Sequence, residues 1–164
     1  MQAGGGHPYR LGVDDDQDVR RIEEALGELV RVASSRRLHA ARMTRVDLAL
    51  SRGEARCLAY LVDTGPRSAA ELAGALDLGP ATARRALAAL ERQGLAGRDP
   101  EAAAARPVRY AASPQGRRAH RRIRRLRHDQ LTAALDGLSS RRRHELVVGL
   151  EDLVERLRSR GPDA

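Results

Sequence analysis

Apolar residues recur at helical spacing towards both ends of the chain. The N-terminal stripe predicts one amphipathic helix over residues 17–41, because its members lie three or four positions apart: Val19, Ile22, Leu26, Leu29 and Ala33. The C-terminal stripe repeats at intervals of four, three and four residues, as in a coiled coil: Leu146, Leu150, Leu153 and Leu157. Each stripe needs an apolar partner, so we expect both ends to form long dimerisation helices.

Two capping boxes mark helix starts in the middle of the chain. Ser51 is followed three positions later by Glu54, and Ser68 by Glu71, so each Ser can accept a backbone N–H while each Glu returns a bond. The helix after Ser68 spans about two turns and breaks at residues 77–80. Pro80 suits the first position of the following helix, where its missing N–H costs nothing.

That following helix has two unlike faces and ends at Gly94, a typical helix stop. Its predicted inner face is apolar: Ala83, Ala86, Leu87 and Leu90. Its outer face carries a hydroxyl and several guanidinium groups: Ala81, Thr82, Arg84, Arg85 and Arg92. A short helix, a tight turn and a second helix of this polarity together predict a helix-turn-helix.

Two short strands are expected next, at residues 95–98 and 107–112, around a hairpin loop over residues 99–106. Ser113 and Pro114 then begin another helix, in which Ala119, Ile123 and Leu126 keep one apolar line. The predicted fold class is therefore mainly α with a small β-hairpin wing. We expect a winged helix-turn-helix core flanked by long N- and C-terminal dimerisation helices.

The net charge of +8 is concentrated in the middle of the chain. Residues 66–128 contain 14 Arg and five acidic residues, a net charge of +9, and the rest contains 16 Arg and 17 acidic residues, a net charge of −1. A positive excess confined to one region is expected of a nucleic-acid-binding module between interaction segments.

Several other classes of protein find no support in the sequence. It has no apolar run long enough to span a membrane and no secretory signal at its start, so we expect a cytoplasmic protein without a membrane segment. The histidines form no metal-ligand spacing and no catalytic constellation is present, so we expect no metal, no cofactor and no enzyme activity. Cys57, the single cysteine, is expected to be an inert, partly buried thiol.

Residues 68–116 resemble the winged-helix core of the MarR family of bacterial transcriptional regulators. Residues 78–95 are similar to its recognition helix, including the closing Leu-Glu and Gly-Leu pattern, and residues 106–116 to its wing strand and the next helix cap. The resemblance implies a homodimeric regulator of transcription, expected to be a repressor, on a pseudo-palindromic double-stranded DNA operator. The corresponding division is a flexible tail (1–13), an N-terminal dimerisation helix and linker (14–48), a winged helix-turn-helix DNA-binding domain (49–112) and C-terminal dimerisation helices (113–164).

The expected DNA contacts follow from this arrangement. A helix in the major groove reads bases with side chains near its N-terminus and on its outer face, here Pro80, Ala81, Thr82, Arg84 and Arg85. Arg106, at the hairpin turn, is expected to enter the minor groove. Phosphate contacts are expected from Ser68, at a helix start, and from Arg98, Arg109 and Arg117.

The resemblance also implies control by a small-molecule effector, bound between the dimerisation helices and the winged helix. Arg36, His39, Arg56 and Tyr60 are expected to line that cleft, and the arginines would favour an anionic ligand. Two alternatives remain at this point. One is an Arg-rich helical adaptor, whose helix from Arg117 binds acidic protein partners or an anionic membrane surface. The other is a nucleoid protein that binds DNA without sequence preference.

Overall fold

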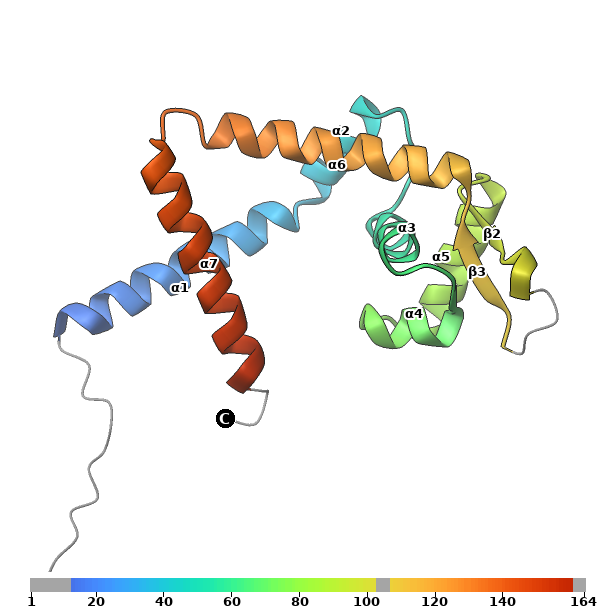
Figure 1. The fold of residues 1–164 in the computed structure, drawn as a ribbon, viewed down its shortest axis with the longest axis horizontal. Helices are drawn as coiled ribbons and strands as arrows, with labels where there is room; N and C mark the ends of the chain where they lie inside the picture. Colours follow the sequence, from blue (N-terminus) through green and yellow to red (C-terminus); the bar gives the residue numbers. More distant parts are fainter. Residues whose placement is uncertain (1–12, 103–106, 161–164) are drawn as a thin grey trace, which may run out of the picture.

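The computed structural model describes residues 13–102 and 107–160 of the 164-residue chain. The elements are, in order, α1 (Val13–Ala33), α2 (Arg36–Arg45), α3 (Arg52–Thr64), β1 (Arg67–Ser68), α4 (Ala69–Ala75), α5 (Pro80–Arg92), β2 (Ala96–Arg98), η1 (Pro100–Ala102), β3 (Arg109–Ala112), α6 (Pro114–Ala134) and α7 (Ser140–Arg160). In Figure 1, α3, α4, α5 and the strands gather at one end and α1 and α7 lie at the other, with the long helix α6 connecting them.

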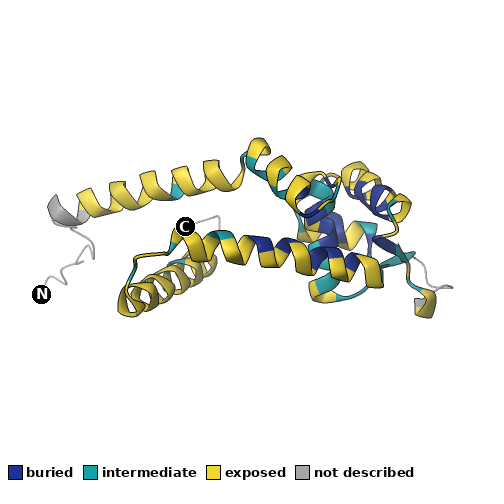
Figure 2. Ribbon diagram, turned by 90° about the horizontal axis from the view of Figure 1, so that it is seen from above, coloured by how far each residue is buried: buried dark blue, intermediate teal, exposed yellow. Residues whose placement is uncertain are grey.

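The apolar core lies within residues 43–126, which we call the winged-helix body. Helix α3 packs against α5 and α6, and α4 packs against α5. Six leucines are almost fully buried where these elements meet: Leu58, Leu61, Leu72, Leu87, Leu90 and Leu95. Figure 2 shows the buried residues concentrated in this body. Because burying one leucine contributes about 1.5–3 kcal/mol, these contacts fix how α5 is presented.

The wing is a three-stranded antiparallel sheet in the order β1, β3, β2. The expected hairpin is present, with Ala96 opposite Ala112 and Arg98 opposite Tyr110. Strand β1 is an additional element that the sequence analysis did not predict, and it pairs Arg67 with Tyr110. A strand of two residues is too short to show an alternation of apolar and polar positions, so β1 is defined only by its pairing with β3.

The predicted helix boundaries in the body are confirmed. Both capping boxes form, with Ser51 and Ser68 as the capping residues of α3 and α4. Helices α3 and α5 stop at glycines with positive φ, 80° at Gly65 and 67° at Gly94, a region that L side chains disfavour. Pro80 is the first residue of α5, as predicted.

The prediction of one helix over residues 17–41 is wrong, because the chain breaks at Ser34 and Ser35. The hydroxyl of Ser35 accepts the backbone N–H of Leu38 at 3.3 Å and starts the separate helix α2. In addition, the guanidinium of Arg52 donates to the backbone carbonyl of Ser34. A serine side chain that caps the following turn competes with helix continuation, and the apolar stripe, which ends at Ala33, does not extend across the break.

Helix α6 begins in close contact with the end of α5. Ser113 caps α6, and its hydroxyl donates to the carbonyl of Gly94 at 2.6 Å. A Cβ atom added at Gly116 would lie 1.9 Å from the carbonyl oxygen of Leu95, so only glycine fits there. This contact fixes α6 against the segment that links α5 to β2.

The two ends of the described chain are far less buried than the body. No residue of α7 is buried, and most apolar residues of α1 are exposed. The segment predicted as a flexible tail lies outside the described residues, apart from Val13, which begins α1. Within the described ranges, no helix combines the length and apolar composition needed to cross a bilayer.

Candidate nucleic-acid interface

Helix α5 presents a polar face outward from the winged-helix body. Ala83, Ala86, Leu87 and Leu90 are buried against the neighbouring elements, as predicted. On the opposite side, the predicted outer residues are all exposed: Pro80, Ala81, Thr82, Arg84, Arg85 and Arg92. The two faces follow from residue type, because leucine and alanine gain by burial whereas an unpaired guanidinium must stay solvated.

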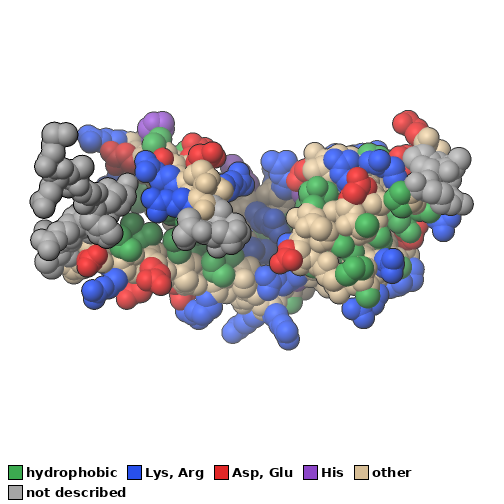
Figure 3. Space-filling model, turned by 90° about the horizontal axis from the view of Figure 1, so that it is seen from below, with side chains coloured by type: hydrophobic (Ala, Val, Ile, Leu, Met, Phe, Trp, Pro, Cys, Tyr) green, Lys and Arg blue, Asp and Glu red, His purple; other side chains and the backbone are tan. Residues whose placement is uncertain are grey.

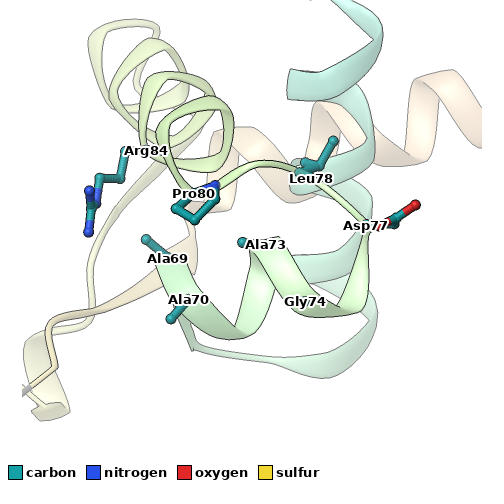
Figure 4. A pocket seen from close by; sticks show the side chains of 8 residues that line it. All are labelled: Ala69, Ala70, Ala73, Gly74, Asp77, Leu78, Pro80 and Arg84. Atoms are coloured by element: carbon teal, nitrogen blue, oxygen red, sulfur yellow. The ribbon is translucent and has the colours of Figure 1, made fainter.

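Arg84 and Arg85 lie in two different grooves beside α5. Arg84 borders an open hollow of about 490 Å³ between α4 and α5, together with Pro80 and small side chains of α4 such as Ala69 and Ala70 (Figure 4). No hydrogen bond or ion pair joins Arg84 to another described residue. Its guanidinium is therefore available to an external acceptor.

Arg85 borders the second groove, between α5 and the start of α3. This hollow of about 390 Å³ is also lined by Glu54 and Arg92. A guanidinium N–H of Arg85 donates to the hydroxyl of Thr82 at 3.3 Å, one turn back on the same helix. Thr82 thus holds Arg85 along the exposed face. Arg92 was expected on this outer face and Glu54 in a capping box, but neither was expected to contact DNA; the seven-residue spacing from Arg85 to Arg92 places both arginines on one helix face.

Ser68 is not placed for the phosphate contact expected from the sequence. Its side chain is only 2% exposed, and its hydroxyl already accepts the backbone N–H of Glu71 at 3.2 Å. In return, the backbone N–H of Ser68 donates to the Glu71 carboxylate at 2.7 Å, and this bond holds the pKa of that carboxyl below its usual range. Ser68 therefore acts in the capping box of α4.

The arginines of the wing differ in how free they are. Arg98, at the end of β2, is exposed and forms no hydrogen bond or ion pair with the described residues. Arg109 is half-buried and donates to the carbonyl of Pro66 at 2.6 Å, which ties β3 to the start of β1. Arg117 donates to the carbonyl of Ala112 at 2.6 Å. Arg106, expected at the wing tip, lies outside the described residues.

The four residues expected to bind an effector do not share one of the hollows described above. His39 has its Nε2 atom 2.7 Å from the carbonyl oxygen of Leu50, and Arg56 donates to the carbonyl of Leu76 at 2.7 Å. Tyr60 is half-buried and packs against the core, whereas Arg36 is exposed at the start of α2. Three of the four thus have contacts within the chain, and the effector cleft stays a prediction.

Cys57 is fully buried in α3, and burial raises the pKa of its thiol, which opposes formation of the reactive thiolate. Among the described residues, no group of three or more histidine, cysteine or acidic side chains is arranged to hold a metal ion.

The fold defines a winged-helix protein in which the second helix of the helix-turn-helix, α5, presents one polar face to solvent. In sequence, residues 45–115 match the family described as the sugar-specific transcriptional regulator TrmB. No protein with a curated description matches the chain in sequence. The comparison with solved structures covers a larger part of the chain.

Three solved structures resemble nearly the whole chain. RV1404 from Mycobacterium tuberculosis is 26% identical, with a TM-score of 0.70 over 89% of this chain and 97% of that one. The MarR family transcription regulator SP03579 is 23% identical, with a TM-score of 0.69 over 91% and 98%. FabT from Streptococcus pneumoniae, solved in complex with DNA, is 20% identical, with a TM-score of 0.62 over 86% and 98%. The predicted resemblance is confirmed, since the chain has the winged-helix fold of MarR-family transcription regulators.

Proposed function

We propose that this protein is a transcriptional regulator that binds double-stranded DNA with sequence specificity. The observation that carries the proposal is the exposed face of α5, with the unpartnered guanidinium of Arg84 and the Thr82-supported guanidinium of Arg85. FabT, which has a similar fold, was solved in complex with DNA, and this supports the same class of ligand here. In this proposal α5 enters the major groove and the wing approaches the adjacent minor groove.

Each arginine of α5 has a chemical reason to contact a base. A guanidinium can donate two parallel hydrogen bonds to O6 and N7 of guanine, and such a pair contributes about 1–3 kcal/mol of discrimination between bases. Arg85 is partly pre-oriented by Thr82, so binding immobilises fewer of its rotamers. Arg98 is free to neutralise a phosphate, a contact that adds affinity without sequence preference.

The proposed regulator acts as a homodimer on a pseudo-palindromic operator. In a single copy, large apolar side chains remain exposed on α1, on α7 and at the end of α6, including Val19, Leu131 and Leu157. Burial of these faces against a second copy would remove them from water. Two recognition helices related by a two-fold axis then require two half-sites about one helical turn of DNA apart. We further propose that the bound protein represses transcription and that a small anionic effector releases it from the operator.

Selection of bound duplexes from a random library, followed by binding titrations, tests this function. We expect the selected duplexes to contain an inverted repeat and to bind at least tenfold more tightly than random DNA at moderate salt. In Arg84→Ala and Arg85→Ala, we expect this preference to be lost at specific base pairs. Arg141→Ala on α7 is the matched control, because Arg141 is exposed and its ion pair with Glu145 lies within α7. Equal binding of selected and random duplexes would contradict sequence-specific regulation and indicate a non-specific DNA-binding protein.

The second candidate is an adaptor for acidic proteins or anionic membranes, favoured by the arginines of α6. Arg118, Arg121, Arg122, Arg124 and Arg125 are exposed and form no hydrogen bond or ion pair with the described residues. A titration with short DNA duplexes at several salt concentrations separates the two functions, because a regulator keeps a preference between DNA sequences at moderate salt whereas an adaptor shows none.

A further inference from the structure

The first half of helix α6 is densely basic. Residues 114–128 contain seven arginines and no acidic residue. Five of these arginines are exposed and form no hydrogen bond or ion pair with the described residues, and we call them the arginine face of α6: Arg118, Arg121, Arg122, Arg124 and Arg125. Each lies three or four positions from another, so their like charges repel along the helix. An external anion would relieve that repulsion.

The other long helices treat their arginines differently. Arg31 of α1 forms an ion pair with Glu28, and Arg141 of α7 forms one with Glu145 at 2.8 Å. Each of these helices contains a further pair of the same kind. Acidic residues one helical turn away thus neutralise several arginines of α1 and α7, whereas the arginine face of α6 has no such acids within residues 114–128.

An open hollow of about 320 Å³ lies beside the arginine face, between α6 and the end of α2. Arg122 and Arg125 border it from α6, and Arg45 borders it from α2. Asp47 and Asp129 border the same hollow, but neither forms an ion pair with a described arginine. Three arginines and two aspartates leave the hollow with a net positive charge, so arginines of two helices can approach one anionic group there.

The arginine face lies away from the surface that we propose reads DNA. In Figure 1, α6 runs along one edge of the winged-helix body and α4 along the opposite edge, with α3 between them. The start of α5, with Pro80 and Arg84, adjoins α4. Figure 3 shows the side that holds α4, where other basic side chains lie on the body, and Figure 2 shows the opposite side, with exposed residues along α6. A duplex against the start of α5 therefore leaves the arginine face uncovered.

The composition of this face favours a nucleic acid over a membrane or a protein. Ala119, Ile123 and Leu126 are buried against the body, so α6 exposes no apolar side chain between residues 117 and 128. A helix on a membrane surface inserts an apolar face, and the centre of a protein–protein interface is apolar or aromatic. Interfaces with DNA are more polar and more positively charged, and a guanidinium can donate two parallel hydrogen bonds to one phosphate.

We propose that the arginine face of α6 is a second DNA-binding surface, which contacts the phosphates of a second duplex without sequence preference. This inference rests on the proposed function, because it adds a second duplex to the one bound by α5. Residues 118–125 extend about 10 Å along the helix, and a duplex carries about six phosphate charges over that length, close to the number of guanidinium groups. A protein with both surfaces bridges two segments of DNA.

A capture assay with the full-length protein tests the second surface. The selected duplex is fixed to beads and saturated with protein, and a fluorescent duplex of random sequence is then added at about 0.05 M salt, where exposed charges are weakly screened. We expect the wild type to capture the random duplex. Arg121→Gln combined with Arg125→Gln should weaken this capture about tenfold or more and lower its salt slope by about two, because two phosphate contacts are lost. Glutamine and arginine have similar helix propensities, so α6 should stay folded and binding of the selected duplex should be unchanged.

Two further variants separate the α6 face from other causes. Arg142→Gln combined with Arg143→Gln, at exposed positions of α7, changes the net charge equally and should leave capture unchanged. Arg84→Ala combined with Arg85→Ala should lose the preference for the selected duplex but still bind random duplex through α6. This variant distinguishes α6 from a second copy of α5 as the bridging surface.

The outcomes distinguish the second surface from the proposed function. No capture by the wild type, wild-type capture by the α6 variant, or an equal loss in the α7 control would overturn the second surface while leaving binding of the selected duplex intact. Binding of polyglutamate or of phosphatidylserine vesicles through α6, without capture of duplex, would overturn it in favour of an acidic protein or a membrane. A wild type that binds neither duplex would overturn the proposed function as well.

Discussion

The winged-helix body and the remaining helices use the same residue types with opposite results. Leu87 and Leu90 of α5 are buried by α3 and α4, whereas Leu150 of α7, in an equally regular apolar stripe, is 43% exposed. We call α1, α7 and residues 127–134 of α6 the arms. Amphipathic periodicity forms both regions, but only the body completes its core within one chain. The body therefore completes its own core, whereas the arms leave apolar surface exposed, which the proposed homodimer would cover.

Gly116→Ala should have the largest effect on stability, because residue 116 lies in close contact with the backbone of Leu95. The added methyl group would overlap the carbonyl oxygen of Leu95, a backbone atom that cannot turn away, and would also approach Leu58. We expect a loss of about 3 kcal/mol or more in the free energy of unfolding, measured by denaturant titration.

Gly53→Ala is the matched control for that substitution. Gly53 lies in the first turn of α3, and nothing is within 4 Å of the position of an added Cβ. Its replacement should be neutral or stabilise the protein by up to about 1 kcal/mol through helix propensity. Equal unfolding curves for Gly116→Ala and the wild type would mean that α6 does not pack on Leu95 as described.

Replacing one leucine in the body and one in the arms compares how much each region contributes to the stability of a single chain. Leu90→Ala leaves a cavity in the body and should cost about 2–5 kcal/mol of unfolding free energy at any protein concentration. Leu150→Ala removes fewer contacts within one chain, so at concentrations where the protein is monomeric its cost should stay below about 1 kcal/mol.

The arm variant should instead change association. Sedimentation over a range of concentrations should show a weaker dimer for Leu150→Ala, whereas Leu90→Ala should leave the dissociation constant unchanged wherever it remains folded. If Leu150→Ala destabilised the monomer as strongly as Leu90→Ala does, the division into a self-sufficient body and dependent arms would be incorrect.

How much of the fold the sequence could predict depended on how local the determining contacts are. Caps and helix stops at Ser51, Ser68, Gly94 and Pro80 depend on chemistry within a few residues, and they were predicted correctly. The split of the N-terminal helix was missed because the apolar stripe ends at Ala33 and the capping role of Ser35, which starts α2, was not recognised. Strand β1 was missed because it exists only through its pairing with β3.

The candidate site was predictable to a similar extent. The outer face of α5 follows from the helical period, so Arg84 and Arg85 were placed correctly on the exposed side. The burial of Ser68 and the contact from Arg109 to Pro66 depend on tertiary packing around β1. A polar side chain at the start of an element can serve the fold or a ligand, and only its three-dimensional neighbours distinguish the two.

The smallest predicted effect concerns pH and the contact between α3 and α6. His120 is buried on α6, and its Nε2 atom lies 3.7 Å from a carboxylate oxygen of the exposed Asp63 on α3, with no hydrogen-bond partner among the described residues. Burial lowers the pKa of His120, the Asp63 carboxylate partly offsets this, and Arg124 and Arg127 lower it further. The imidazole is therefore neutral in the folded protein near neutral pH.

The unfolded chain binds a proton at this histidine below about pH 6.5, and the folded chain does so only at lower pH. The contribution of neutral His120 to the free energy of unfolding is thus fully present above about pH 6.5. It decreases as the pH falls from there to the pKa of His120 in the folded protein, by no more than about 1.4 kcal/mol per pH unit. Denaturant unfolding between about pH 8 and about pH 5 measures this slope. His120→Leu should flatten it, whereas His128→Leu, at an exposed position of the same helix, should retain it. An unchanged slope in His120→Leu would assign the acid sensitivity to other groups and leave the α3–α6 contact independent of pH.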